Sequence, residues 1–162
     1  MKTIILGVGD YDVTNTPGQQ LKTLGLGSCV AVIILDPVSR CIAMDHIALP
    51  ESKISPDRAR QKPGYFADTG IPALLEAMKR TGAGKNHQKM IVKLVGGANV
   101  MDPNNTFNIG KRNVLAIKKI LWKYGMGPLA EDVGGRISRT VTVDVDTGRV
   151  HVSSPGRTDW EV

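Results

Sequence analysis

Short segments rich in apolar and β-branched residues recur along the chain, and residues that favour turns separate them. This pattern is typical of β-strands that pack into a sheet. We expect strands at residues 3–8, 29–36, 41–47, 90–95, 140–145 and 148–152.

Two longer segments carry apolar residues at helical spacing and predict helices over 65–80 and 109–125. In the second segment the apolar residues that recur at this spacing are Val114, Ile117, Leu121 and Tyr124. In the first, Pro72 favours a start near Thr69 or a bend, because proline is excluded from a helix interior. Strands and helices together predict a mixed α/β fold.

The chain carries no internal repeat, no low-complexity segment and no long linker. A length of 162 residues is typical of one domain, so residues 1–162 are expected to fold as a single domain. The most loop-like stretch is PESKISPDRARQKPG, residues 50–64, which predicts a mobile surface loop.

Composition places the chain among ordinary globular proteins, with 41% hydrophobic and 22% charged residues. The apolar run in MKTIILGVGDY is too short for a signal peptide, and no segment has the length needed to span a bilayer. We therefore expect a cytoplasmic protein whose two cysteines, Cys29 and Cys41, stay reduced.

The residues between the apolar runs at 29–36 and 41–47 predict a β-hairpin. This connection, DPVSR at residues 36–40, contains the Asp, Pro and Ser that favour a turn. A two-residue turn centred on Pro37 and Val38 sets the pairing register along the whole hairpin.

In this register Cys29 lies directly opposite His46, with Cβ atoms about 4.5–5.5 Å apart. Cys41 lies opposite Ile34 and on the other face from Cys29, because strand side chains alternate. Asp45 also points away from Cys29. A three-residue turn would shift the register by one and place Cys29 and His46 on different faces.

A cysteine beside a histidine suits acyl-transfer chemistry, because an imidazolium lowers the thiol pKa and the thiolate attacks. Backbone N–H groups of the glycine-rich turn, around Gly27 and Ser28 in TLGLGSC, are candidates to hold an oxyanion. Thr23 is a candidate to orient His46, although the sequence alone barely selects it. The simpler alternative stays open: Cys29 is a small buried residue and His46 an interior histidine with satisfied hydrogen bonds.

Seven motifs follow one another along the chain: TLGLGSCV, HIALP, GYFAD, VGGANV, NIGKRN, AEDVGGR and DTGRV. In this order they resemble the bacterial chemoreceptor glutamine deamidase family, CheD. The resemblance runs from about residue 4 to residue 152, and the ordered series is more specific than any single glycine cluster.

The resemblance implies a cysteine hydrolase that converts particular glutamines of chemotaxis receptors to glutamates and releases ammonia. It implies that Cys29 is the nucleophile and that His46 and Thr23 complete the catalytic set. It also implies an α/β sandwich of mixed, largely antiparallel strands with two main helices.

The chain departs from the family pattern around His46, where Ala43, Asp45 and Ala48 replace a glycine, a small or amide residue, and a methionine. The segment RISR at 136–139 also differs from the usual glycine-containing version. The catalytic residue types are kept, so the departures bear on substrate preference more than on chemistry.

Charge and family resemblance together define the expected partners. A net charge of +6 without a long basic run is most simply a solvated surface, and such a surface also favours an acidic partner. The resemblance implies cytoplasmic receptor helices as the substrate and a CheC-type phosphatase as a candidate regulator. Scattered basic residues and few aromatic ones argue against nucleic acid. A noncatalytic adaptor of the same fold and a methylesterase acting on receptor glutamates are the alternatives.

No cofactor or metal site is expected. The GVG and GLG triplets are too short for a dinucleotide-binding motif, and His87 and His151 lack the spacing of metal ligands. The segment VGGANV, residues 95–100, follows an apolar run and predicts a turn in preference to an anion site.

Overall fold

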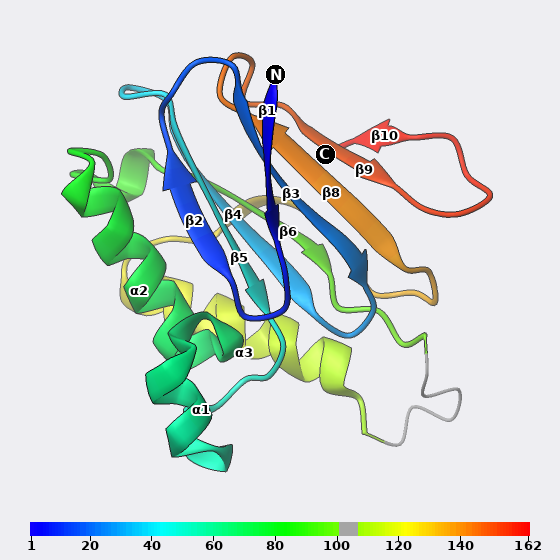
Figure 1. The fold of residues 1–162 in the computed structure, drawn as a ribbon. Coiled ribbons are helices and arrows are strands. Elements are labelled where there is room, and N and C mark those ends of the chain that lie inside the picture. The colour runs from blue at the N-terminus through cyan, green and yellow to red at the C-terminus, as the bar shows by residue number, and fades with distance from the viewer. Residues whose placement is uncertain (101–106) are drawn as a thin grey trace.

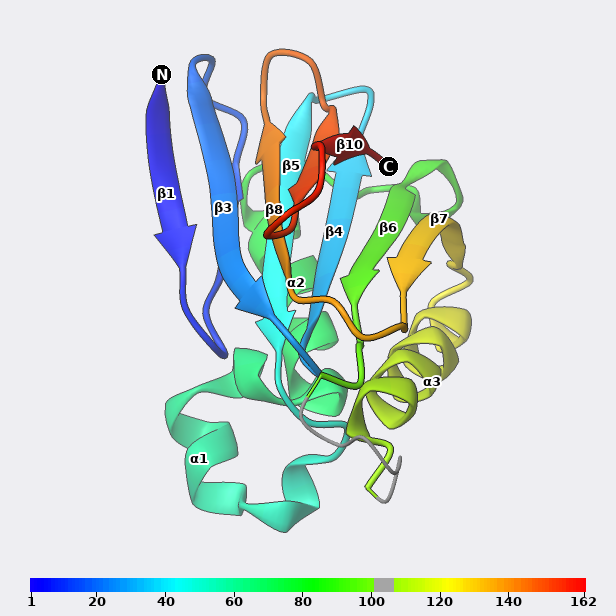
Figure 2. The same cartoon turned by 90° about the vertical axis from the view of Figure 1, so that its right-hand side faces the viewer.

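Two five-stranded β-sheets lie face to face (Figure 1, Figure 2). Helices cover the free face of one sheet, which is therefore the middle of three layers. The computed structural model describes residues 1–100 and 107–162. The outer sheet, away from the helices, has the order β1-β3-β8-β9-β10. Its strands are β1 Lys2–Leu6, β3 Gln19–Leu26, β8 Arg139–Asp144, β9 Val150–Ser153 and β10 Trp160–Glu161.

The middle sheet has the order β2-β5-β4-β6-β7. Its strands are β2 Tyr11–Thr14, β5 Cys41–Ile47, β4 Val30–Asp36, β6 Ile91–Gly96 and β7 Pro128–Val133. Every residue of β4 and β5 is buried, because one face of the sheet packs on the helices and the other on the outer sheet. This double burial explains their continuous apolar runs.

Helices α2 Ala67–Arg80 and α3 Ile109–Lys123 pack their apolar sides against the middle sheet. Helix α2 starts at Ala67, within the predicted segment 65–80 and before the start near Thr69 that Pro72 favoured. It continues through Pro72, which lies in its second turn. None of the described helices is long and apolar enough to cross a bilayer.

The segment predicted as a mobile loop, residues 50–64, instead contains short helices, so that prediction is wrong. They are the 3-10 turn η1 Ser52–Ile54, helix α1 Pro56–Gln61 and the start of the 3-10 turn η2 Pro63–Tyr65. A further 3-10 turn, η3 His87–Lys89, precedes β6.

The predicted fold class is confirmed, since six of the described strand pairs are antiparallel and two are parallel. All six expected strands occur with small shifts at their ends, and the sequence patterns missed β2, β3, β7 and β10. The stretch TLGLGSC does not open a strand. Its first four residues, 23–26, form the end of β3 in the outer sheet. Residues 27–29 then cross to β4 in the middle sheet.

The β4–β5 hairpin has a longer turn than predicted. Asp36 pairs with Cys41 across a four-residue connection, in which Arg40 adopts a left-handed conformation with φ 59°. Consequently Ala31, not Cys29, lies opposite His46. The predicted direct pair is wrong, but the register differs by two residues and therefore preserves the faces. Cys29 packs toward the outer sheet and Cys41 toward the helices, so the two cysteines lie on opposite faces, as predicted.

Candidate active site

A hydrogen bond between Thr23 and His46 joins the two sheets inside the protein. Thr23 lies on β3, His46 lies on β5, and the distance between Thr23 Oγ1 and His46 Nδ1 is 2.7 Å. The Thr23 hydroxyl donates its own hydrogen to the Leu6 carbonyl oxygen, 2.7 Å away. Thr23 Oγ1 must therefore accept from Nδ1–H, which leaves the Nε2 lone pair of His46 available.

The imidazole of His46 is 2% exposed, and its Nε2 has no hydrogen-bond partner among the described residues. Burial lowers the pKa of His46 to about 4, with Asp10 opposing this shift and Lys62 adding to it. His46 is accordingly neutral at pH 7. A neutral imidazole with a free Nε2 is equipped to accept a proton.

Cys29 lies in the crossing segment directly before β4 and packs, half-buried, on the side that faces the outer sheet. His46 is on the same side of the middle sheet, two residues after Met44, which belongs to the same apolar cluster. Burial raises the pKa of the Cys29 thiol, and the backbone N–H of Cys29 opposes the shift. The resting pair is thus a thiol and a neutral imidazole, in place of the thiolate and imidazolium expected from sequence.

The backbone of the crossing segment is held by the residues that follow β6. Gly97 N–H donates to the Cys29 carbonyl at 2.8 Å, and Ala98 N–H donates to the Gly27 carbonyl at 2.8 Å. Gly96 has φ 118°, and a Cβ there would collide with the Cys29 carbonyl oxygen. The glycine pair in VGGANV therefore allows a close approach to the Cys29 backbone, a role beyond the predicted turn.

Asn113 on α3 reaches the same segment and was missed by the sequence analysis. Its Nδ2 donates to the Ser28 carbonyl at 2.9 Å and to the Ala48 carbonyl at 3.0 Å. The available signal was a polar residue on the apolar stripe of the predicted helix, because Asn113 precedes Ile117 by four positions.

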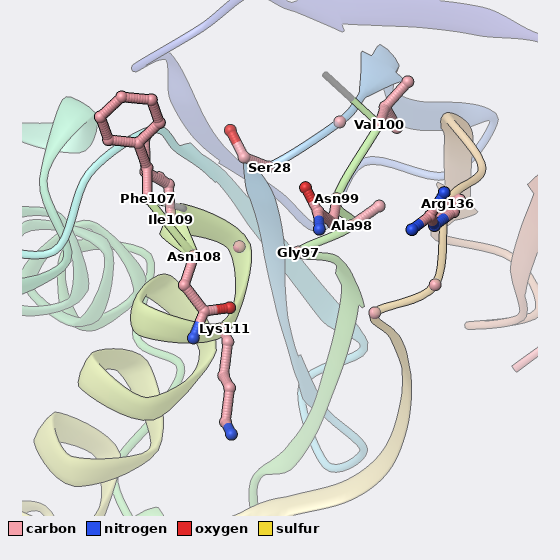
Figure 3. Close-up of a pocket in the computed structure, with 14 residues that line it drawn as sticks. Ser28, Gly97, Ala98, Asn99, Val100, Phe107, Asn108, Ile109, Lys111 and Arg136 are labelled. Atoms are coloured by element: carbon pink, nitrogen blue, oxygen red, sulfur yellow. The ribbon is translucent and has the colours of Figure 1, made fainter. Parts of the chain in front are cut away.

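A pocket of about 560 Å³ opens beside the crossing segment (Figure 3). Gly27 and Ser28 form part of its wall, and the start of α3 contributes Asn108 and Lys111. Figure 3 labels Ser28 and Asn99 among the residues that line the pocket. Gly27 and Ser28, which the sequence predicted as oxyanion candidates, thus line a space large enough for a side chain of a second molecule.

Asp45, the neighbour of His46 in sequence, points to the opposite face and is fully buried. Neither carboxylate oxygen has a hydrogen-bond partner among the described residues. The carboxyl group lies so close to Gly64 and Gly70 that no side chain fits at either position. Burial raises the pKa of Asp45 well above its ordinary value, and Asp10 adds to the shift. Asp45 belongs to the packing of the helices and not to the Cys29 face.

Three basic residues of the segment 50–64 interact with neighbouring residues. Lys62 forms an ion pair with Asp10 at 3.1 Å, Arg60 pairs with Asp57, and Arg58 lies 4.8 Å above the Tyr65 ring.

Comparison with known proteins gives consistent matches along nearly the whole chain. The family model described as CheD chemotactic sensory transduction matches residues 48–154. A protein of Syntrophotalea carbinolica named "Probable chemoreceptor glutamine deamidase CheD" is 55% identical over all of both chains. The Thermotoga maritima "Chemoreceptor glutamine deamidase CheD" is 42% identical over 94% of this chain and 92% of its own.

A "Probable chemoreceptor glutamine deamidase CheD" of Solibacter usitatus is 46% identical over 97% of this chain and 92% of its own. Among solved structures, a Neisseria meningitidis protein assigned to DUF152 gives a TM-score of 0.44 at 11% identity, covering 83% of this chain and 63% of that one. The family match and the high identity over full length agree with the motif order in the sequence. The chain belongs to the CheD family.

Proposed function

We propose that this protein is a cysteine hydrolase that deamidates glutamine side chains of chemotaxis receptors to glutamates. Family membership and the names of the full-length relatives support the activity. The Thr23–His46 hydrogen bond carries the proposal at the level of geometry, because it leaves Nε2 free on the face where Cys29 lies.

The first half of the reaction forms a thioester. His46 Nε2 takes the proton of the Cys29 thiol as Sγ attacks the carboxamide carbon of a receptor glutamine. The tetrahedral intermediate collapses when protonated His46 returns the proton to the leaving amino group, which departs as ammonia. Thr23 holds the ring in the tautomer that this exchange requires.

The second half consumes water and restores the enzyme. His46 Nε2 takes a proton from water, the resulting hydroxide attacks the thioester carbon, and the carbon–sulfur bond breaks. The thiolate of Cys29 regains its proton from His46, and the receptor side chain leaves as a glutamate. No cofactor enters this balance.

We propose that the crossing segment also supplies the oxyanion site. The carbonyl groups of Gly27 and Ser28 accept hydrogen bonds from Ala98 and Asn113. In a trans peptide the N–H of the next residue points opposite to the carbonyl, so the N–H groups of Ser28 and Cys29 are directed away from these partners. We assign them to the oxyanion of the tetrahedral intermediate.

The pocket beside the crossing segment is the proposed binding site for a cytoplasmic receptor helix. Lys111 is exposed at the pocket and brings positive charge near acidic residues of such a helix. We also propose that residues 1–162 act as one domain, because the core between the sheets draws on strands from both ends of the chain. A CheC-type regulator remains a prediction from the family resemblance.

Incubation with a cytoplasmic receptor fragment, followed by peptide mass spectrometry, tests the proposal. We expect conversion of a few defined glutamines to glutamates with an equal amount of ammonia released. A parallel incubation with alkylated enzyme corrects for spontaneous deamidation. Stable binding of the fragment without conversion would contradict the hydrolase and favour the adaptor alternative.

A further inference from the structure

We infer that Asn113 is a positioning residue that fixes the Cys29 segment against the end of the strand that carries His46. The kinetic part of this inference rests on the proposed deamidase activity. Its geometric part, the placement of the Cys29 thiol, stands independently of the substrate.

The side chain of Asn113 bridges two chain segments that no longer pair with each other. The β4–β5 ladder ends at the pair Val30 and Ile47. Immediately beyond it, Nδ2 of Asn113 donates one hydrogen to the Ser28 carbonyl and one to the Ala48 carbonyl, at 2.9 and 3.0 Å. Both partners are carbonyl oxygens, so only the amide nitrogen can face them. Asn113 thereby continues the connection between the strands past the end of the ladder.

This bridge acts next to both proposed catalytic side chains. Ser28 directly precedes Cys29, and Ala48 lies two residues after His46. The side chain of Asn113 is completely buried, so water does not replace a hydrogen bond that it loses. Loss of the bridge therefore changes the position of Cys29 relative to His46.

Helix α3 is itself held rigidly where Asn113 needs it. Gly110, one turn earlier on the helix, lies so close to the carbonyl oxygens of Gly97 and Ala98 that a Cβ at this position would collide with them. The same two residues donate hydrogen bonds to the Cys29 and Gly27 carbonyls. The crossing segment is thus held by Gly97 and Ala98, which follow β6, and by Asn113.

Replacing Asn113 should move two reactivities in opposite directions. For Asn113→Ala we expect kcat for receptor deamidation to fall about 10- to 100-fold with KM within about twofold, because the nucleophile is misplaced. Release of the segment exposes the thiol whose pKa burial raises, so alkylation of Cys29 by iodoacetamide at pH 7 should become faster. The alkylation rate of Cys41 should not change, because it is buried on the other face.

Two further variants separate positioning from general stability. Ile117→Val shortens a buried side chain one turn away on the same helix and should lower stability without changing kcat or Cys29 alkylation. Asn113→Leu keeps a similar volume without the donors and should show the same fall in kcat and the same faster alkylation of Cys29. It provides the test if Asn113→Ala does not fold.

The inference is overturned if folded Asn113→Ala or Asn113→Leu keeps the wild-type kcat and the wild-type Cys29 alkylation rate. It is also overturned if Cys41 becomes reactive in parallel in both variants, since Asn113 then supports the fold as a whole and not the Cys29 segment. If the wild-type protein shows no deamidation, the proposed function fails, and the ratio of Cys29 to Cys41 alkylation still decides the role of Asn113.

Discussion

The two cysteines lie at opposite ends of the β4–β5 hairpin and differ in almost everything except residue type. Cys29 is half-buried beside a pocket, on the face that carries His46. Cys41 is fully buried against the helices, and its Sγ lies 3.8 Å from the Thr81 hydroxyl. One position offers access and a base, and the other offers neither.

Thiol pKa alone does not separate these two residues. Burial raises the pKa of both, and the Cys41 thiol is further affected by the Thr81 hydroxyl, which lowers its pKa, and by Asp36, which raises it. The difference lies in the neighbours: His46, oriented by Thr23, shares a face with Cys29. In the proposed mechanism Cys29 acts as the nucleophile because of its base and its access, and not because of a depressed resting pKa.

Apart from loss of the thiol itself, the largest expected effect comes from removing the base that distinguishes the two sites. His46→Ala should lower kcat/KM by about a thousandfold, the order of magnitude attributed to general acid–base catalysis. Steady-state ammonia release with the receptor fragment measures it, with circular dichroism as the check on folding. Retention of more than a tenth of the activity would mean that Cys29 does not depend on this histidine.

A smaller effect is expected from Thr23, which touches only the far side of the ring. Thr23→Val keeps the shape but removes the acceptor for Nδ1–H, so kcat should fall about 10- to 100-fold through the wrong tautomer. Thr23→Ser restores the hydroxyl and should recover most of the activity. Equal kinetics for the valine and serine variants would remove the hydroxyl from the account.

The pH profile should show the low pKa of His46. The base must be unprotonated, so kcat/KM should change by less than about twofold from pH 7 to 5.5 and fall only as pH approaches 4. Between pH 6.5 and about 4 the unfolded chain protonates this histidine but the folded chain does not, so stability falls as pH drops through this range. Rates are therefore compared only at pH values where the protein remains folded. An acid limb centred near 6.5 would contradict the buried, neutral imidazole.

Asp45 lies on the helix side of the hairpin, like Cys41, and should affect stability alone. The raised pKa of Asp45 means that the folded chain holds a proton above pH 3.8 that the unfolded chain releases. Stability therefore falls as pH rises, by about 1.4 kcal/mol per pH unit until the native carboxyl ionises.

Asp45→Asn removes this dependence and should stabilise the protein more at pH 7 than at pH 5, with deamidation unchanged. Urea unfolding at the two pH values measures the difference. A stability gain that is the same at both would show that Asp45 is not protonated in the folded protein.

Much of the architecture was predictable because strands buried on both faces have continuous apolar sequences. The apolar runs of β4 and β5 and the stripe of α3 all predicted the elements that occur. Strands β3 and β7 were missed because they are exposed on one side and carry polar residues such as Gln19 and Glu131. The hairpin register was two residues off because a left-handed Arg40 lengthens the turn.

Details of the site depend on contacts between distant segments, which local patterns do not contain. The Asn113 bridge joins residues 65 and 85 positions away, and Thr23 meets His46 across two different sheets. The resting charge states depend on burial, so sequence predicted an ion pair where the structure has a neutral pair. The family resemblance implied roles for Cys29, His46 and Thr23 but not for Asn113, and it did not give the arrangement of any of them.

The most direct test compares Cys29→Ala with Cys41→Ala in the receptor deamidation assay. Cys29→Ala should remain folded and convert no glutamine above the spontaneous rate, because the nucleophile is gone. Cys41→Ala should lose some stability and keep kcat within about twofold of wild type, because a small buried side chain is shortened on the opposite face. Full conversion by Cys29→Ala, or a selective loss of activity in folded Cys41→Ala, would contradict the account.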